Sequence, residues 1–208
     1  MVDEDSIFIL QGFLQKLKQH LLDRITPTLP QDATNENDGQ VLFRHDRIYQ
    51  HSTMRINFTT YDVRRAQDVV NPSTSHCNVM LLNNDDDSEA LPACSDKYAR
   101  VLGIYHVNAV YVGHGMTDYQ PRRMEFIWAR WYRQVEPTRS GWRTRRLDRV
   151  QFLPTADDDA FGFIDPSQVL RGCHLIPAFN KGKAHADGKG LSVCAQDAKD
   201  WRQYYVNR

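Results

Sequence analysis

The sequence lacks the features of a membrane or secreted protein. No stretch of its 208 residues approaches the ~18 consecutive apolar residues that a membrane-spanning helix needs, so we expect no membrane partner. The chain begins Met1-Val2-Asp3-Glu4-Asp5, which is acidic where a signal peptide would be basic. Its four cysteines form no CxxC pair, and we interpret most of them as small, reduced core residues. The sequence therefore predicts an intracellular protein.

An excess of charge of either sign is also absent. Lys and Arg together number 26, as do Asp and Glu, so the formal net charge is zero. This balance excludes a uniformly basic nucleic-acid coat protein, but it leaves room for a local basic face. Hydrophobic residues make up 41% and aromatic residues 11% of the chain, too many for a disordered protein. The length favours one domain with a small appendage.

The N-terminal region predicts one amphipathic helix over residues 6–25. Its apolar side chains recur at three- and four-residue steps, and Pro27 and Pro30 stop it. Residues 26–40 have no periodicity and are predicted to be an exposed linker. The helix either packs on the following domain or serves a partner.

Beyond residue 40 the pattern alternates, which is typical of strands. We expect Val41-Leu42-Phe43 and Ile48-Tyr49 to form a hairpin, and 61–76 to be irregular with a turn at Asn71-Pro72. One helical turn is expected from Asp165 through Leu170. Further strands are predicted at 54–60, 79–82, 98–112, 123–135, 148–153, 160–164 and 173–176.

Many short strands and few helices favour a mostly β fold, a small and strongly curved sheet or barrel. We predict three segments. Residues 1–38 form the helix and linker, 39–178 the β-barrel, and 179–208 a C-terminal arm. The arm is rich in Gly, Lys and Asp at 180–200, which predicts mobility, and it ends in an aromatic anchor at Trp201, Tyr204 and Tyr205.

Catalytic motifs are mostly missing from the sequence. There is no GxSxG and no HExxH, and the glycine-rich run 182–190 lacks the spacing and the Ser or Thr of a phosphate-binding loop. The pairs His76-Cys77 and Cys173-His174 could meet in a zinc site, but adjacent side chains on a strand point to opposite faces. We therefore predict no metal, no cofactor and no enzyme activity, with a Cys/His or carboxylate hydrolase as the remaining catalytic alternative.

Two features point to recognition instead. The central strands are rich in aromatic residues, a subset of which could hold a quaternary ammonium group by cation–π attraction. Between residues 122 and 149 there are nine arginines against three acidic residues. Arginine pairs bidentately with phosphate and stacks on bases, so this segment is a candidate nucleic-acid face unless its charges pair with acidic loops.

Three blocks of sequence resemble the bromo-adjacent homology (BAH) domain family over roughly 97–177. The first is Lys97-Tyr98-Ala99-Arg100-Val101-Leu102-Gly103-Ile104-Tyr105, and the second runs from Phe126 to Thr138 around Trp131-Tyr132. The third is Asp148–Pro154 followed by Asp165–Leu175. The whole chain also resembles segments of DNA-transposon proteins of mushroom-forming fungi and of plant CACTA-type transposon proteins.

The BAH resemblance implies a chromatin-binding β-barrel in the nucleus. Carried over from methyl-lysine-reading members, the cage aromatics are Tyr98, Trp131 and Phe152, with Asp157 as the acid that favours the cation. The implied ligand is a histone tail or another partner peptide. The sequence departs from the family pattern at Arg149, where the family has an acid, and in the arginine-rich loop that follows Arg133.

DNA is the alternative partner that the sequence predicts. In this alternative the chain is the nucleic-acid-binding domain of a transposon protein, and it binds through Arg139, Trp142, Arg143, Arg145 and Arg146. The sequence leaves the oligomeric state open.

Overall fold

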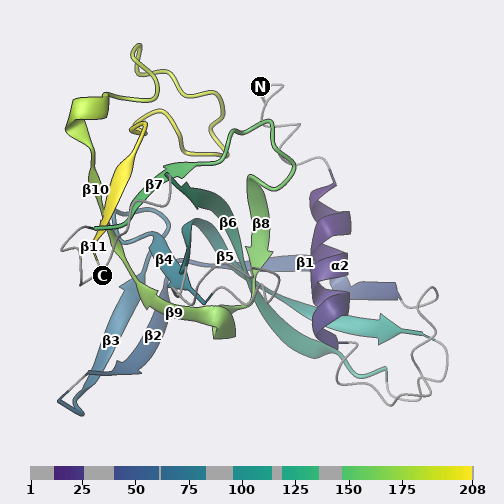
Figure 1. The fold of residues 1–208 in the computed structure, drawn as a ribbon. Helices are drawn as coiled ribbons and strands as arrows, with labels where there is room; N and C mark the ends of the chain where they lie inside the picture. Colours follow the sequence, from purple (N-terminus) through teal and green to yellow (C-terminus); the bar gives the residue numbers. More distant parts are fainter. Residues whose placement is uncertain are drawn as a thin grey trace, which may run out of the picture.

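The fold is mostly β, as predicted, with one helix packed against a strongly curved sheet (Figure 1). The computed structural model describes residues 12–25, 40–60, 62–82, 96–113, 119–135 and 147–207. The helical elements are α2 (Phe13–Ile25) and the short 3₁₀ turns η3 (Pro166–Gln168) and η4 (Phe179–Lys181). The first strands are β1 (Gln40–His51), β2 (Met54–Thr59), β3 (Arg65–Val70), β4 (Asn78–Leu81), β5 (Lys97–Val112) and β6 (Arg122–Gln134). The later strands are β7 (Arg149–Phe152), β8 (Phe161–Ile164), β9 (Val169–Gly172), β10 (His174–Pro177) and β11 (Tyr204–Asn207).

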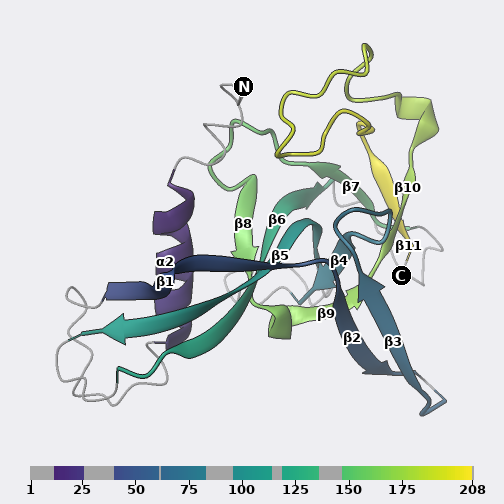
Figure 2. The same cartoon turned by 180° about the vertical axis from the view of Figure 1, so that it is seen from behind.

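The bend between strands β9 and β10 connects the two ends of the sheet and nearly closes it into a barrel. The strand order is β10-β11-β7-β6-β5-β4-β9, with β1 added on β5 and β8 on β6. Strands β9 and β10 are separated only by Cys173, yet β9 pairs with β4 at one end of this order and β10 pairs with β11 at the other. The backbone N–H of Cys173 donates to Asn78 O at 2.9 Å across this bend. Figure 2 shows the same curvature from behind.

The two long central strands bury both of their faces. Tyr98 on β5 lies opposite Tyr132 on β6, and Tyr132 lies opposite Phe152 on β7. These three rings share one hydrophobic cluster. Ala99 and its cross-strand partner Trp131 belong to a second cluster, on the other face. The alternation of side chains along a strand therefore divides the core into two packed layers.

Helix α2 packs on the sheet, which is the first of the two alternatives given for it above. Leu17, Leu21 and Ile25 are buried against a cluster that includes Val107 and Phe126. The side chain of Arg24 makes an ion pair with Asp165 at 2.7 Å and donates to Glu125 O at 2.6 Å. The helix ends at Ile25, as predicted, and the predicted residues 6–11 lie outside the described part of the chain. None of the described helices is long and apolar enough to cross a membrane.

The predicted hairpin at 41–49 is wrong. Both halves belong to the single strand β1, which pairs with β5 on either side of a bulge between Phe43 and Ile48. His45 and Asp46 adopt positive φ angles of 61° and 51° within that bulge. The polar residues therefore loop out of the ladder while the strand keeps its direction.

The segment 61–76 was expected to be irregular, but it contains strand β3. This strand pairs with β2 over six residue pairs to form a separate two-stranded sheet that projects from the barrel (Figures 1 and 2). The predicted turn at Asn71-Pro72 follows it: Asn71 Oδ1 accepts a hydrogen bond from Ser73 N at 2.9 Å. The predicted C-terminal arm also contributes strand β11 to the main sheet.

The packing of α2 predicts a large difference between two leucines of the same helix. Leu21 is fully buried, whereas the side chain of Leu14 is exposed. We expect Leu21→Ala to lower the free energy of unfolding by about 2–5 kcal/mol, because it removes a buried side chain and leaves a cavity. Leu14→Ala should change it by less than about 0.5 kcal/mol. Urea unfolding of both variants measures this; equal effects would contradict the docking of α2 on the sheet.

His20 predicts a pH dependence of stability. Burial, followed by the charge of Arg24, lowers the pKa of His20, although Asp165 and Asp23 oppose the shift. In the unfolded state His20 has the ordinary histidine pKa of about 6.5, which is higher than its pKa in the folded state. Below that pH the unfolded state therefore binds a proton more readily than the folded state does. The free energy of unfolding should be highest at pH values above the unfolded-state pKa of His20, and it should decrease as the pH falls below that pKa. We expect His20→Phe to flatten the curve of unfolding free energy between pH 5 and 8, and an unchanged curve would contradict this role.

Candidate functional site

The structure does not bring the four cage residues predicted from the BAH resemblance together. Tyr98 is 1% exposed and donates its hydroxyl to Asp148 Oδ2 at 2.9 Å. Phe152 lies in the same cluster, partly buried. Trp131 points to the other face of β6 and packs over Gly162 of β8, where an added Cβ would lie 2.7 Å from its indole nitrogen. Asp157 lies exposed in the turn after β7.

The ring of Phe152 already contacts two cations of the protein itself. The guanidinium carbon of Arg130 lies 4.0 Å from the ring centroid, and that of Arg100 lies 4.5 Å away. The ring of Tyr132 stacks on Phe152 at a centroid distance of 4.1 Å. Cation–π attraction at this ring is thus internal and stabilises two arginines of the barrel.

These two arginines form the most highly charged part of the interior. Arg100 on β5 and Arg130 on β6 are direct cross-strand partners, an arrangement in which like charges repel. The carboxylate of Asp200, from the C-terminal arm, lies between them. Arg100 Nη1 donates to one of its oxygens at 2.6 Å, and Arg130 Nη1 donates to the other at 2.9 Å. The Asp200 side chain is 4% exposed, so this is a buried three-member network.

The surroundings of the network affect both guanidinium groups. Burial works against the charged form of Arg100, but Tyr132, Asp200 and Tyr204 outweigh it and raise its pKa. Burial lowers the pKa of Arg130, and the like charge of Arg100 adds to that shift. Because the ordinary pKa of an arginine side chain lies far above 7, both side chains stay charged at pH 7. One carboxylate therefore bridges two buried cations.

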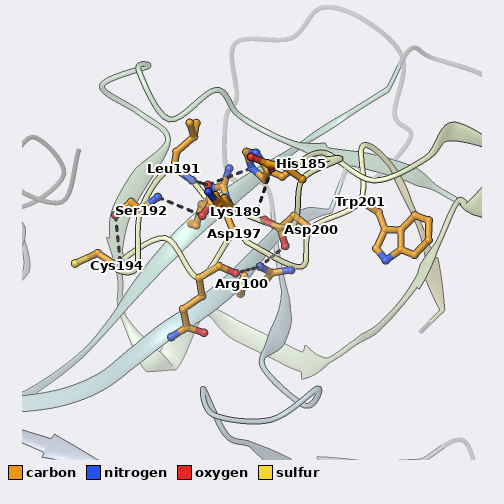
Figure 3. Close-up of polar contacts among 12 residues, drawn as sticks. Arg100, His185, Lys189, Leu191, Ser192, Cys194, Asp197, Asp200 and Trp201 are labelled. Atoms are coloured by element: carbon orange, nitrogen blue, oxygen red, sulfur yellow. Dashed lines mark hydrogen bonds and ion pairs between the residues drawn. The ribbon is translucent and has the colours of Figure 1, made fainter. Parts of the chain in front are cut away.

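The C-terminal arm is held in shape by a second buried carboxylate, Asp197 (Figure 3). Its side chain accepts hydrogen bonds from the backbone N–H groups of Leu191 and Ser192 at 3.0 and 3.3 Å. It also lies 3.3 Å from the Nε2 atom of His185. Gly190 packs so closely on Asp197 that a Cβ at this position would collide with the carboxylate. The arm is thus held by polar contacts, together with the packing of Ala195 and Tyr204 into two hydrophobic clusters. The mobility that its composition predicts stays a prediction.

The arm forms one wall of a cleft of about 800 Å³. The opposite walls come from the turn 72–78, from Arg100 on β5 and from His174 on β10. The arm contributes Ser192, Gln196 and Trp201, among others. The thiol of Cys77 also lines the cleft, and burial raises the pKa of that thiol.

A second cleft of about 680 Å³ adjoins the first. It lies between β3, the same turn and the bend from β9 to β10, and it shares Thr74, Asn78 and His174 with the first cleft. We call the two clefts together the groove. The groove runs from the projecting β2–β3 sheet, where Asp68 lines it, to the C-terminal arm.

The other residues that the sequence singled out for binding cannot be placed. Arg139, Trp142, Arg143, Arg145 and Arg146 lie outside the described residues, as does the acidic loop 83–89. Among the residues that are described, no group of three or more His, Cys, Asp or Glu side chains is arranged to hold a metal ion.

Comparison with known proteins gives no match: neither a family model, nor a curated protein, nor a solved structure resembles this chain significantly. The BAH resemblance therefore rests on the sequence motifs given above.

Sequence reasoning missed the carboxylates of the arm that form one wall of the groove. Asp197 and Asp200 stand in a stretch of Gly, Lys and Asp that has no periodicity, and nothing local distinguishes them from solvated residues. Two sequence signals pointed here. Asn71-Pro72 predicted the turn that forms one wall, and the pairs His76-Cys77 and Cys173-His174, which the sequence suggested could meet, line the two clefts.

The two-arginine network predicts that Asp200 is essential for stability. Asp200→Asn leaves two buried cations without a counter-charge, so we expect a loss of about 3–5 kcal/mol in the free energy of unfolding. Asp187→Asn, an exposed change in the same arm, should cost less than about 0.5 kcal/mol. Adding Arg130→Met to Asp200→Asn should restore part of the loss, because it removes one of the two repelling charges. Denaturant unfolding measures all three, and a mild Asp200→Asn effect would contradict this account.

Proposed function

We propose that this chain is a non-catalytic recognition module that binds an extended peptide in the groove. The observation that carries the proposal is the adjoining pair of clefts, which share Thr74, Asn78 and His174. A continuous hollow between a sheet, a turn and an arm fits a length of polypeptide better than a compact small molecule.

The chemistry of the lining supports a peptide ligand. Hydroxyl and amide side chains are present along the lining, and these groups can donate to or accept from the main chain of an extended peptide. The lining residues of this type are Ser73, Thr74, Ser75, Asn78, Ser192 and Gln196 in the first cleft, and Gln67, Asn71 and Asn207 in the second.

Two candidate nucleophiles in the first cleft are not activated, which supports binding over catalysis. Burial raises the pKa of Cys77, which keeps its thiol protonated and unreactive at neutral pH. Ser192 is 4% exposed, and its hydroxyl oxygen accepts a hydrogen bond from Cys194 N at 3.1 Å. The imidazole of His185 is directed to Asp197.

The resemblances found in the sequence support a class of peptide for this groove. Resemblance to the BAH family favours a histone tail, or another peptide from a chromatin partner, and hence a nuclear location. The resemblance to transposon proteins favours a chain encoded by, or derived from, a mobile element.

Blocking the groove should abolish peptide binding. We expect the full chain to bind at least one member of a set of labelled histone-tail peptides, measured by fluorescence anisotropy. Ser75 is exposed and lines the first cleft, so Ser75→Trp should fill it and weaken that binding roughly tenfold or more, which corresponds to about 1.4 kcal/mol.

Ser52→Trp is the matched control, because Ser52 is exposed and lies outside both clefts. It should bind like the unaltered chain. Equal affinity of the Ser75→Trp variant, or no binding of any peptide by the unaltered chain, would contradict the proposal.

A further inference from the structure

The outer face of the β2–β3 sheet carries exposed residues, Arg55 and Arg65 among them, that lie outside the peptide groove. This two-stranded ribbon projects from the barrel, and within the described chain neither of its strands pairs with a third (Figures 1 and 2). Six residues on each strand are paired, which gives a length of about 20 Å at roughly 3.4 Å per residue.

The inner face of the ribbon is fixed to the barrel. Asp68 Oδ2 accepts a hydrogen bond from Gly172 N at 3.0 Å and lies 3.4 Å from Arg171 Nε. The guanidinium of Arg171 lies 3.9 Å from the ring centroid of Phe58. Met54 and Ile56 pack against the core. Because one face is anchored at several points, the opposite face is held in a defined orientation.

The outer face carries arginine, neutral hydrogen-bonding residues and one valine, and no acid. Its exposed members are Arg55, Asn57, Thr59, Arg65, Gln67 and Val69. Cross-strand pairing places Asn57 opposite Gln67, in the middle, and their side-chain amides are joined by a hydrogen bond of 2.8 Å. Arg65 lies opposite Thr59 toward the tip, and Arg55 lies opposite Val69 toward the base. No described carboxylate forms an ion pair with Arg55 or Arg65, in contrast to Arg64, which pairs with Asp62 at 2.9 Å.

We infer that the outer face of this ribbon is a binding surface for duplex DNA, which adjoins the peptide groove at Gln67 and Val69. A two-stranded β-ribbon fits the major groove of B-DNA, which is about 12 Å wide. The composition of the outer face matches that use: arginine contacts phosphate or guanine, and asparagine and glutamine contact adenine. With two cations and no acid, the charge of the face is complementary to a polyanion. The inference goes beyond the peptide-binding proposal, and it uses none of the arginines at 139–146.

The test is the salt dependence of DNA binding. The probe is a labelled duplex of mixed sequence, about 20 base pairs long, titrated with the full chain at several salt concentrations and followed by fluorescence anisotropy. Each phosphate contact contributes about 0.9 to the slope of log affinity against log salt. Arg55→Ala/Arg65→Ala should therefore lower the magnitude of the slope by about 2 and weaken binding roughly tenfold or more at low salt. Arg55→Lys/Arg65→Lys should keep most of the slope.

The matched control is Lys181→Ala/Arg202→Ala, which removes two exposed cations of the C-terminal region that do not belong to the ribbon. It should leave both affinity and slope unchanged. A duplex RNA of the same sequence should bind more weakly, because its deep and narrow major groove does not admit a ribbon. Thermal unfolding of each variant verifies that it is folded, as expected for side chains that face solvent.

Several results would overturn the inference: no DNA binding by the unaltered chain at low salt, an unchanged slope in the Arg55→Ala/Arg65→Ala variant, or equal binding of duplex RNA. The two proposals also fail separately. Ser75→Trp should still bind DNA, and Arg55→Ala/Arg65→Ala should still bind peptide, so each measurement reports on its own surface.

Discussion

The structure depends on one carboxylate shared by two arginines. Strand pairing places Arg100 directly opposite Arg130, in an interior where neither charge is stable alone. Asp200 neutralises part of that charge, and Phe152 offers its ring to both cations. The carboxylate comes from the C-terminal arm. The contacts that compensate the two arginine charges inside the barrel therefore also hold the arm on the barrel. The position of the two arginines thus determines where the C-terminal arm packs on the barrel.

The position of the arm in turn creates the groove. The arm stands opposite the turn that begins at Asn71, and the space between them is the first cleft. The bend at Cys173 both nearly closes the barrel and joins this cleft to the second one. Strand β3 of the projecting ribbon lines the second cleft with Gln67, Asp68 and Val69. The groove and the cationic outer face of the ribbon thus adjoin on one scaffold.

The sequence predicts the regular part of this fold well and the site poorly, for physical reasons. Residues 98–112 and 123–135 are recognised as strands because β-branched and aromatic side chains are dense there. A bulged strand and a hairpin have the same local pattern at 41–49, and only the pairing with β5 distinguishes them. Strand β3 reads Arg-Ala-Gln-Asp-Val-Val and has little apolar alternation, since its stability comes from β2 and β9. Asp200 meets its partners across 70 and 100 residues of sequence, a contact that no local pattern encodes.

Native-state hydrogen exchange tests most directly whether the arm is an integral part of the barrel. The amides to follow are Ala184, which donates to Asp200 O at 2.9 Å, and Leu191, which donates to Asp197. If Asp200 fixes the arm through the buried arginines, these amides should be protected to nearly the same free energy as those of the neighbouring strand β5. Exchange of the arm amides at close to the unprotected rate, with β5 still protected, would show that the arm opens on its own and would contradict the account.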